Sequence, residues 1–266
     1  MTKNILISGA SSGIGKAIGE YLTDKGHKVI GTSRNPDKKY KKFELISLDV
    51  TDDESVKRAC KLALEKLTRI DVLINNAGFG IYGPIEQTSI EDTKSQFETN
   101  YFGVVRMTNE ILPHFKSNHN GGLIINISSL AALIGLPFQG HYSASKFALE
   151  GYIEALRMEL KPFNIKACNI NPADFKTEFS VNRRLVSSVS VEYNEKFNQF
   201  LRMYEREEND GANPILISKL IDKLINQDNI KVRYLIGRQS QTIGFTMKRL
   251  LGSSLFEKMM SKMWNV

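Results

Sequence analysis

A tyrosine and a lysine four residues apart, Tyr142 and Lys146, are the side chains of this 266-residue sequence whose types and spacing best suit acid–base chemistry. The segment 142–161 has a helical pattern, and positions i and i+4 of a helix share one face with their Cβ atoms about 5–6 Å apart. A free tyrosine titrates at about 10, too high for ready proton exchange at neutral pH. A nearby ammonium favours the phenolate, so the pair predicts a tyrosine that gives a proton to a carbonyl or removes one from an alcohol.

A serine at the end of a predicted strand extends this arrangement. The apolar run 123–127 is typical of a strand buried on both faces, and it ends in two serines, of which Ser129 lies 13 residues before Tyr142. Open parallel sheets bind their ligands at the carboxyl ends of strands. A hydroxyl at that edge can stabilise the substrate oxygen while its charge changes.

A glycine-rich loop predicts a dinucleotide site. Residues 9–15 read GASSGIG, between a predicted strand at 3–8 and a predicted helix at 13–25. Glycine permits a tight turn and a close approach of backbone N–H groups to a pyrophosphate, and the helix N-terminus adds its positive dipole end. The spacing is GxxxGxG rather than GxGxxG. We expect cofactor contacts from Gly9, Ser11, Ser12, Gly13, Ile14 and Gly15.

The end of the second predicted strand, 28–32, favours NADP(H) over NAD(H). NAD-selective sites place a carboxylate here to bind the ribose 2′-hydroxyl. This sequence has Ser33 and Arg34 in its place. A carboxylate would repel a 2′-phosphate, whereas the Arg34 guanidinium binds it through charge-assisted hydrogen bonds, with Ser33 and Ser11 as further donors. NADP(H) is therefore the expected cofactor.

With the glycine loop, Ser129, Tyr142 and Lys146 in this order, the sequence resembles the short-chain dehydrogenase/reductase superfamily over residues 3–177. The resemblance implies hydride transfer between a nicotinamide and an alcohol or carbonyl substrate, with a catalytic tetrad of Asn100, Ser129, Tyr142 and Lys146. In this assignment Asn100 anchors a relay water, and Ser129 rather than Ser128 stabilises the substrate oxygen. Tyr142 is the general acid or base. Lys146 lowers its pKa and binds the nicotinamide ribose.

Other segments are similar to cofactor-binding motifs of the same superfamily. Residues 75–78 read NNAG, which there borders the adenosine, and 171–177 correspond to the segment that binds the nicotinamide carboxamide. Ala173 replaces a family glycine, so a position that required positive φ would cost about 1 kcal/mol or shift the loop. The resemblance implies further cofactor contacts from Asp49, Val50, Asn76, Ala77, Gly78, Tyr142, Lys146, Pro172, Phe175 and Thr177.

The elements that must position these residues alternate between short apolar runs and amphipathic segments. This alternation predicts an α/β fold: a Rossmann-like, doubly wound parallel sheet with helices on both faces. With no repeat or linker, we expect one domain over 1–266. We expect strands near 3–8, 28–32, 44–48, 71–75, 123–127, 165–170 and 234–236, and helices near 13–25, 54–66, 95–116 and 142–161.

Two segments of the last third depart from this alternation. Residues 178–213 contain no strand pattern and are too long for a plain connection, which predicts a helical substrate flap over the site, rich in aromatic residues. Residues 240–266 form a predicted helical extension, in which apolar residues from Leu255 to Trp264 recur at i, i+3 and i+4. That stripe either packs on the domain or forms a wall of a lipophilic pocket, a subunit contact or an interfacial anchor.

Composition excludes several classes of protein. Hydrophobic residues make up 41% and charged residues 24%, as in an ordinary globular chain. Two cysteines cannot form a disulfide framework, four histidines lack ligand spacing, and we expect no metal. No apolar run is long enough to span a bilayer and no signal segment precedes the first strand, which predicts a cytoplasmic protein. The net charge of +7 comes with no nucleic-acid-binding signature.

Three functions remain open, of which the first is preferred. It is an NADP(H)-dependent oxidoreductase of a bulky apolar alcohol, ketone or aldehyde; runs 135–138 and 147–151 look like the hydroxysteroid and retinol dehydrogenase branch. The second is a ketoreductase of acyl thioesters or small polar carbonyls. The third is a non-catalytic NADP(H)-binding regulatory module, which an intact tetrad disfavours. The resemblance also suggests a homodimer or homotetramer through 95–116 and 142–161, and the basic C-terminal tail leaves peripheral membrane contact open.

Overall fold

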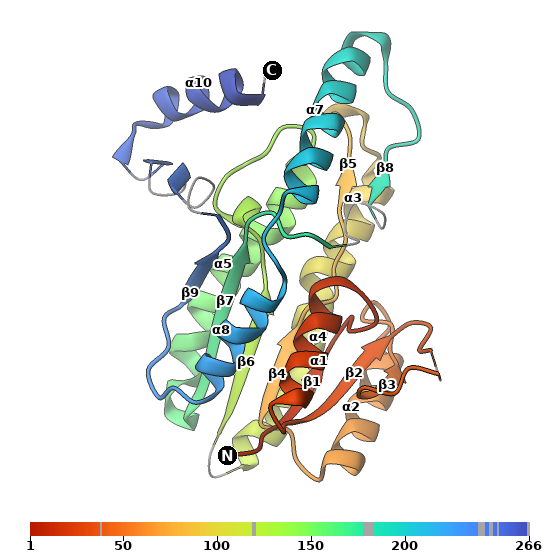
Figure 1. Ribbon diagram of the computed structural model, residues 1–266, viewed down its shortest axis with the longest axis vertical. Helices are drawn as coiled ribbons and strands as arrows, with labels where there is room; N and C mark the ends of the chain where they lie inside the picture. The colour runs from red at the N-terminus through yellow and green to blue at the C-terminus, as the bar shows by residue number, and fades with distance from the viewer. Residues whose placement is uncertain are drawn as a thin grey trace.

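The computed structural model describes residues 1–37, 39–118, 121–177, 183–238, 243–244, 247–248 and 250–264. A seven-stranded sheet in the order β3-β2-β1-β4-β6-β7-β9, with every pair parallel, forms its centre (Figure 1). The order reverses between β1 and β4, where a doubly wound sheet binds its ligand. The strands are β1 Asn4–Ile7, β2 Lys28–Ser33, β3 Glu44–Ser47, β4 Val72–Asn75, β6 Gly122–Ile127, β7 Ile165–Pro172 and β9 Arg233–Ile236.

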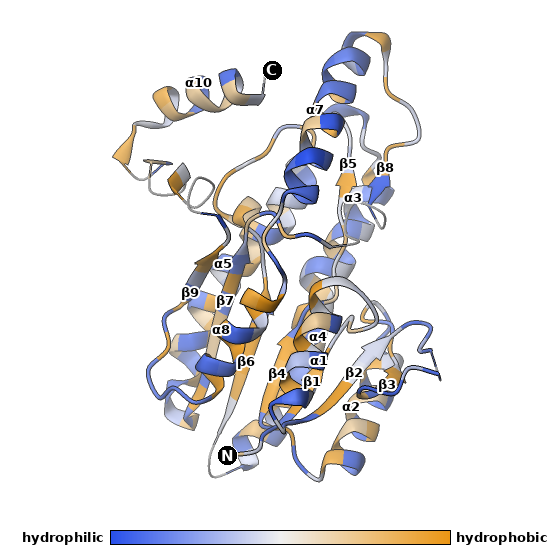
Figure 2. Cartoon of the chain, in the orientation of Figure 1, coloured by the Kyte–Doolittle hydropathy of each residue, from blue (hydrophilic) through white to orange (hydrophobic). Residues whose placement is uncertain are grey.

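Helices cover both faces of this sheet. One face packs against α1 (Gly13–Asp24) and α8 (Ile215–Ile225), which share a buried cluster with β1. The other face packs against α2 (Asp53–Leu67), α4 (Gly103–Ser117) and α5 (Gly140–Leu160) through a second buried cluster. Figure 2 shows the resulting pattern, with hydrophobic residues on the central strands and hydrophilic ones on the outer helix surfaces. The Rossmann-like α/β class is therefore confirmed.

A line of buried asparagines crosses the middle of the sheet. The Asn75 side-chain amide donates to Asn126 Oδ1 at 2.9 Å, and the Asn126 amide donates to Asn169 Oδ1 at 3.1 Å. The Asn169 amide then donates to the carbonyl of Leu149 in α5, at 3.2 Å. Unpaired buried amides would be costly, so this line fixes the register of three strands and the position of α5.

The predicted helix at 95–116 is two helices joined by a π-helical turn. Helix α3 spans Ile90–Phe97, the turn η2 spans Glu98–Phe102, and α4 follows. Such a turn inserts an extra residue into the helical repeat and often occurs at functional sites. Here it places Asn100 in a fully buried position.

The predicted flap is largely helical, as expected, but the expectation that it holds no strand is wrong. Helix α7 covers Val191–Asn209, whereas β8 (Arg184–Leu185) pairs in parallel with β5 (Ile81–Tyr82). Strands of two residues are too short for an alternating pattern, so the sequence carried no signal for them. Residues 178–182 of the flap lie outside the described residues.

The C-terminal helix α10 spans Ser253–Trp264. Phe256 is buried, and the Trp264 ring lies 5.6 Å from the Phe200 ring of α7. Of the predicted extension 240–266, residues 240–242, 245–246, 249 and 265–266 are not described. No helix in the described part of the chain is long and apolar enough to cross a membrane.

Candidate active site

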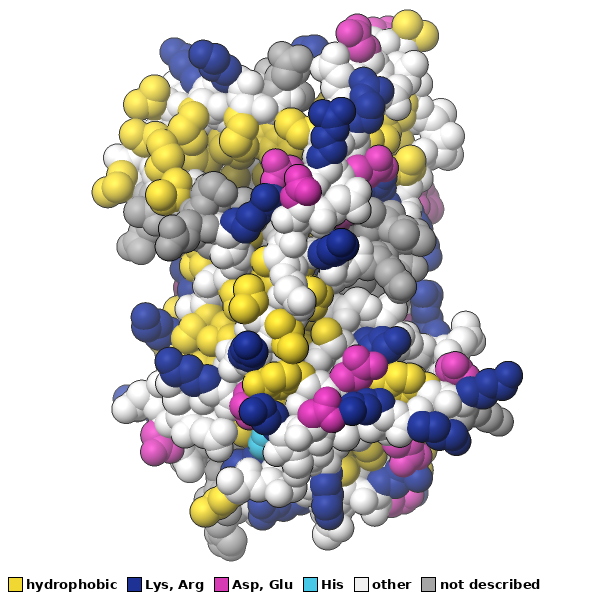
Figure 3. Space-filling model, viewed as in Figure 1, with side chains coloured by type: hydrophobic (Ala, Val, Ile, Leu, Met, Phe, Trp, Pro, Cys, Tyr) yellow, Lys and Arg dark blue, Asp and Glu magenta, His cyan; other side chains and the backbone are white. Residues whose placement is uncertain are grey.

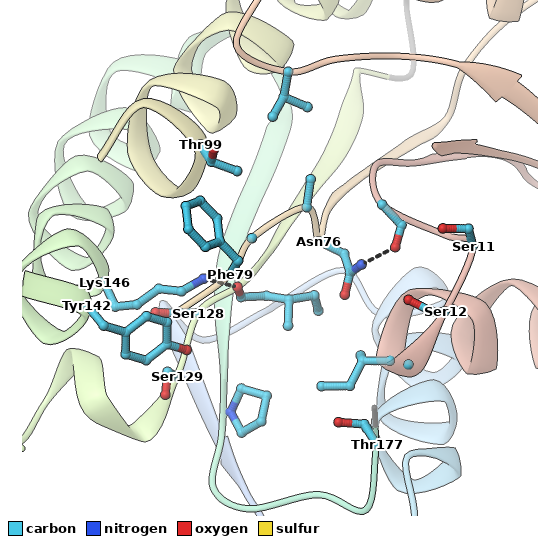
Figure 4. A pocket seen from close by; sticks show the side chains of 18 of the residues that line it. Ser11, Ser12, Asn76, Phe79, Thr99, Ser128, Ser129, Tyr142, Lys146 and Thr177 are labelled. Atoms are coloured by element: carbon cyan, nitrogen blue, oxygen red, sulfur yellow. Dashed lines mark hydrogen bonds between the residues drawn. The ribbon is translucent and has the colours of Figure 1, made fainter. Parts of the chain in front are cut away.

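A cavity of about 580 Å³ opens at the carboxyl ends of the strands. It contains every predicted cofactor and catalytic residue except Gly15 and Asn100, which lie behind its wall. Figure 4 shows Tyr142, Lys146 and Ser129 on one side of it and Ser11 and Ser12 on the other. Residues from many separate stretches of the sequence thus meet at the edge of the sheet where ligands bind.

The glycine loop is shaped by close backbone contacts. Gly9 has φ +65, and a Cβ atom there would lie 2.8 Å from Ala77 Cα. A Cβ atom at Gly15 would lie 2.3 Å from the carbonyl oxygen of Gly9. Only glycine fits both positions, because any side chain would push the loop away from the sheet. The Asn76 amide holds the same turn by donating to the carbonyl of Gly9 at 2.7 Å.

The loop leads into a helix N-terminus that is suited to an anion. Ser12 caps α1 with extended backbone but makes no side-chain capping bond, and the first turn contains no acidic residue. Unsatisfied N–H groups and the positive end of the helix dipole therefore face the cavity. Both features fit the pyrophosphate of a dinucleotide.

Arg34 and Ser33 lie where the second strand meets the cavity. Among the described residues, no carboxylate forms an ion pair with Arg34. The neighbouring Asp49 is held by its own turn, where its Oδ1 accepts hydrogen bonds from the Thr51 N–H at 2.9 Å and hydroxyl at 2.7 Å. Val50 packs against Gly103. The rim near Arg34 thus has a basic group available for an anionic ligand.

Tyr142 is buried in the cavity wall, and its hydroxyl is hydrogen-bonded to Ser129. The Ser129 Oγ also accepts from the Ala131 N–H at 3.1 Å, at the start of a short 3-10 helix. Burial raises the pKa of Tyr142 to about 12, the Ser129 hydrogen bond opposes this, and the Glu208 and Asp174 carboxylates add to it. The predicted lowering by Lys146 is not found, because Lys146 is not among the groups that shift this pKa and burial sets the upward direction.

Lys146 lies one helical turn beyond Tyr142, with its Nζ 5.9 Å from the centre of the Tyr142 ring. The Nζ donates to the carbonyl of Ile127 at 3.0 Å, so the amine is held against the end of β6. Burial lowers its pKa from 10.5 to about 8, and Glu150 acts in the opposite direction. A lysine with such a pKa exchanges its proton readily near neutral pH.

Asn100 binds the backbone behind the cavity. Its amide nitrogen donates to the Phe79 carbonyl at 3.0 Å and to Ser145 Oγ at 3.1 Å, and its oxygen accepts from the Phe79 N–H at 3.0 Å. A Cβ atom at Gly78 would lie 3.1 Å from the Asn100 oxygen and 3.5 Å from Lys146 Nζ. Asn100 and Lys146 therefore face the same glycine from two helices.

The end of β7 and the segment after it close the remaining side of the cavity with Pro172, Phe175 and Thr177. Ala173 is not among the described non-glycine residues with positive φ, so it carries none of the strain that we considered. Its N–H donates to the Ile236 carbonyl at 2.9 Å. Thr177 lies opposite Gly13, where an added Cβ atom would be 3.7 Å from the threonine Cβ.

Several cavity residues were missed in the sequence. Asp174 follows the predicted strand, and Tyr204 and Glu208 come from the inner face of α7. Tyr204 belongs to the aromatic flap, but nothing in the sequence distinguished Glu208 from the other acidic residues of the flap. Its burial depends on how α7 crosses the cavity, which local sequence patterns do not encode.

Comparisons with known proteins identify the family of this chain. A family model described as short chain dehydrogenase matches residues 3–186. The chain belongs to the short-chain dehydrogenase family. A 3-ketodihydrosphingosine reductase from Bacteroides thetaiotaomicron is 40% identical over 255 residues, covering 95% of this chain and 94% of that protein. Human retinol dehydrogenase 8 is 37% identical over 203 residues, covering 71% of this chain and 63% of that protein.

A solved short-chain dehydrogenase from Streptomyces avermitilis has the same fold, with a TM-score of 0.81 and 29% identity over 100% of this chain and 97% of that one. Members of the short-chain dehydrogenase family bind NAD(H) or NADP(H). The chain is thus an oxidoreductase that acts on CH–OH groups or the corresponding carbonyls. The resemblance to the superfamily is confirmed, and the regulatory module is set aside.

Proposed function

We propose that this short-chain dehydrogenase is an NADP(H)-dependent reductase of a bulky apolar ketone. The observation that carries the proposal is one shared cavity, in which buried Tyr142, Ser129 and Lys146 lie across from the glycine loop and Arg34. The loop suits a pyrophosphate, and Arg34 suits the additional 2′-phosphate of NADP(H). A bound nicotinamide supplies or accepts the hydride.

The side chains divide the remaining chemistry among them. The Tyr142 hydroxyl donates a proton to the substrate oxygen, and the Ser129 hydroxyl donates a hydrogen bond to the same atom. Since the pKa of Tyr142 is about 12, the phenol stays protonated across neutral pH, which suits a proton donor and the direction of reduction. Lys146 returns a proton to Tyr142 and binds the nicotinamide ribose. Asn100 positions Lys146 and the water that relays the proton.

Three observations support a bulky apolar substrate. Tyr204 lines the cavity and belongs to an aromatic cluster with Tyr82, Phe138, Phe197 and Phe200, so an apolar surface continues from the site into the flap. The Bacteroides relative is named for 3-ketodihydrosphingosine, a long-chain ketone. Exposed apolar side chains also gather around α10, next to the flap (Figure 3).

Assembly and location form a separate part of the proposal. Exposed Phe102, Phe147 and Met158 lie near or on α4 and α5, the helices expected to meet a second copy of the chain. Apolar side chains in this position fit a homodimer or homotetramer. We retain a cytoplasmic location, with no nucleic-acid partner. Sedimentation velocity measures the assembly.

The decisive experiment follows NADPH absorbance with ketones and aldehydes of graded length, in the wild type and in Tyr142→Phe. We expect Tyr142→Phe to bind NADPH normally but to lose at least a thousandfold in kcat, because it lacks the proton donor. Tyr152→Phe makes the same substitution at another position of α5, so it is the control and should keep its activity. Full turnover by Tyr142→Phe would overturn the mechanism, and a preference for short acyl thioesters would favour the second candidate function.

A further inference from the structure

Two carboxylates outside the tetrad face the proposed proton donor. Asp174 lies in the segment after β7, and Glu208 lies near the end of α7. Both line the cavity that contains Tyr142, and both raise its pKa. Electrostatic effects on a buried phenol are strongest at short range. The two acidic groups therefore belong to the part of the cavity where the substrate oxygen must lie.

Glu208 is the more unusual of the two. Glu208 is only 7% exposed, and its Oε2 is buried without a hydrogen-bond partner among the described residues. The neighbouring acids of α7 do have partners, since Glu205 pairs with Arg183 and Glu207 with Arg238. A buried carboxylate oxygen without a partner is costly and calls for a ligand that supplies a donor.

The charges around Glu208 show which kind of ligand fits. Burial raises its pKa to about 7, Arg183 lowers it, and Asp174 and Glu205 raise it. Burial likewise raises the pKa of Asp174 to about 6, with Glu207 adding to this and Arg238 opposing it. A cation bound between Glu208 and Asp174 would relieve the repulsion between these carboxylates. It would also donate a hydrogen bond to Glu208 Oε2.

We propose that Glu208 and Asp174 form an ammonium subsite, so that the ketone carries a protonated amine on a carbon close to the carbonyl. This inference rests on the proposed reductase function and specifies its substrate class as long-chain amino ketones. It also resolves a conflict within the site. Two carboxylates beside Tyr142 oppose release of its proton, and a bound ammonium cancels their charge when the proton must move. Substrate binding thereby completes the electrostatics of the reaction.

The test compares two ketones that differ only in the amine, 2-aminododecan-3-one and dodecan-3-one. We expect the wild type to prefer the amino ketone by at least tenfold in kcat/KM, as a charge-assisted hydrogen bond would give. Glu208→Gln keeps the shape but removes the charge, so this preference should fall by about tenfold. The same variant should turn over dodecan-3-one faster, because a charge opposing the phenolate is gone. Glu195→Gln, an exposed acid of the same helix, should leave both rates as they are.

The positively charged nicotinamide of NADP⁺ is the other cation that could bind these carboxylates. The Glu208→Gln variant distinguishes it from a substrate ammonium. Equal losses for both ketones in Glu208→Gln, together with weaker binding of NADP⁺ but not NADPH, would assign the carboxylates to the cofactor and overturn the subsite. An unchanged preference in Glu208→Gln would also overturn it.

A binding measurement separates this inference from the proposed function. Calorimetry with dodecylamine and dodecan-1-ol needs no turnover. If the wild type reduces neither ketone, the reductase proposal fails. The subsite still stands if dodecylamine binds the wild type more tightly than dodecan-1-ol and Glu208→Gln removes the difference, and it falls if the two ligands bind alike.

Discussion

The Asn171 side-chain amide donates to Glu150 Oε1 at 2.8 Å, a buried contact between the end of β7 and the middle of α5. The same amide nitrogen donates to the carbonyl of Ser129 at 3.0 Å. Glu150 also accepts from the Ser128 hydroxyl at 3.1 Å and from Arg233 Nε at 3.0 Å. This network links Ser129, which lines the cavity, to the helix that carries Tyr142, so we expect Glu150 to act as a positioning residue for the site.

Removing that carboxylate should affect stability and geometry together. Glu150→Ala leaves Asn171 and Arg233 short of an acceptor, and we expect a loss of about 3 kcal/mol in the free energy of unfolding, measured in urea. We also expect kcat to fall more than the affinity for NADPH, because Ser129 moves while the glycine loop does not. Glu154→Ala removes the exposed partner of the same Arg233 and should cost less than 1 kcal/mol. Equal costs for the two variants would contradict the network.

Cofactor choice is tested at Arg34. Arg34→Asp replaces a group that attracts the 2′-phosphate by one that repels it and can bind a ribose 2′-hydroxyl. We expect the Kd of NADPH to rise by about a hundredfold or more while that of NADH changes little or falls. Fluorescence titration with each cofactor measures both constants. Parallel changes in the two titrations would show that Arg34 does not contact the phosphate.

Much of the fold could be predicted because its signals are local. The buried strands of a parallel sheet are unbroken apolar runs, so β1, β4 and β6 could be placed within a residue or two. Gly9 and Gly15 could be assigned because close backbone approach requires glycine. These inferences needed only a window of sequence and a known geometric constraint.

The rest depends on long-range packing. The π-helical turn that buries Asn100 arises from an extra residue between two helices that read as one in the sequence. The burial of Glu208 depends on the path of α7, and the raised pKa of Tyr142 depends on desolvation by the assembled cavity. Pairwise spacing in the sequence predicted that Lys146 lowers the pKa of Tyr142, whereas burial and two carboxylates from distant segments raise it.

The C-terminal helix provides a test of the apolar pocket. The Trp264 ring packs on the Phe200 ring. Tyr204 stacks on the same Phe200 ring and lines the cavity. Trp264→Ala should therefore loosen the flap and raise the KM for dodecan-3-one several-fold, with less effect on butanone. The exposed neighbour, Met263→Ala, should leave both KM values as they are. Equal changes in KM for long and short ketones in Trp264→Ala would show that α10 does not contribute to the substrate pocket.

We expect the buried Lys146 ammonium to lower the free energy of unfolding at neutral pH. Its pKa is lowered from 10.5 to about 8, so between these pH values the folded chain binds fewer protons than the unfolded chain, and stability rises with pH across this window. At pH 7 the folded chain bears the full cost of the buried charge, about 3 kcal/mol. Lys146→Met removes this cost and gives up a hydrogen bond to Ile127 worth about 1 kcal/mol.

We therefore expect Lys146→Met to be more stable than the wild type by about 1–2 kcal/mol at pH 7, and to have lost its activity. The gain should shrink towards zero as the pH approaches 10, because the wild-type lysine is then neutral in the folded chain. Urea unfolding at several pH values measures the trend, and Lys61→Met, at an exposed position of α2, controls for the general effect of losing a charge. A gain of the same size at pH 7 and pH 10 would show that improved apolar packing, rather than relief of a buried ammonium, stabilises the variant.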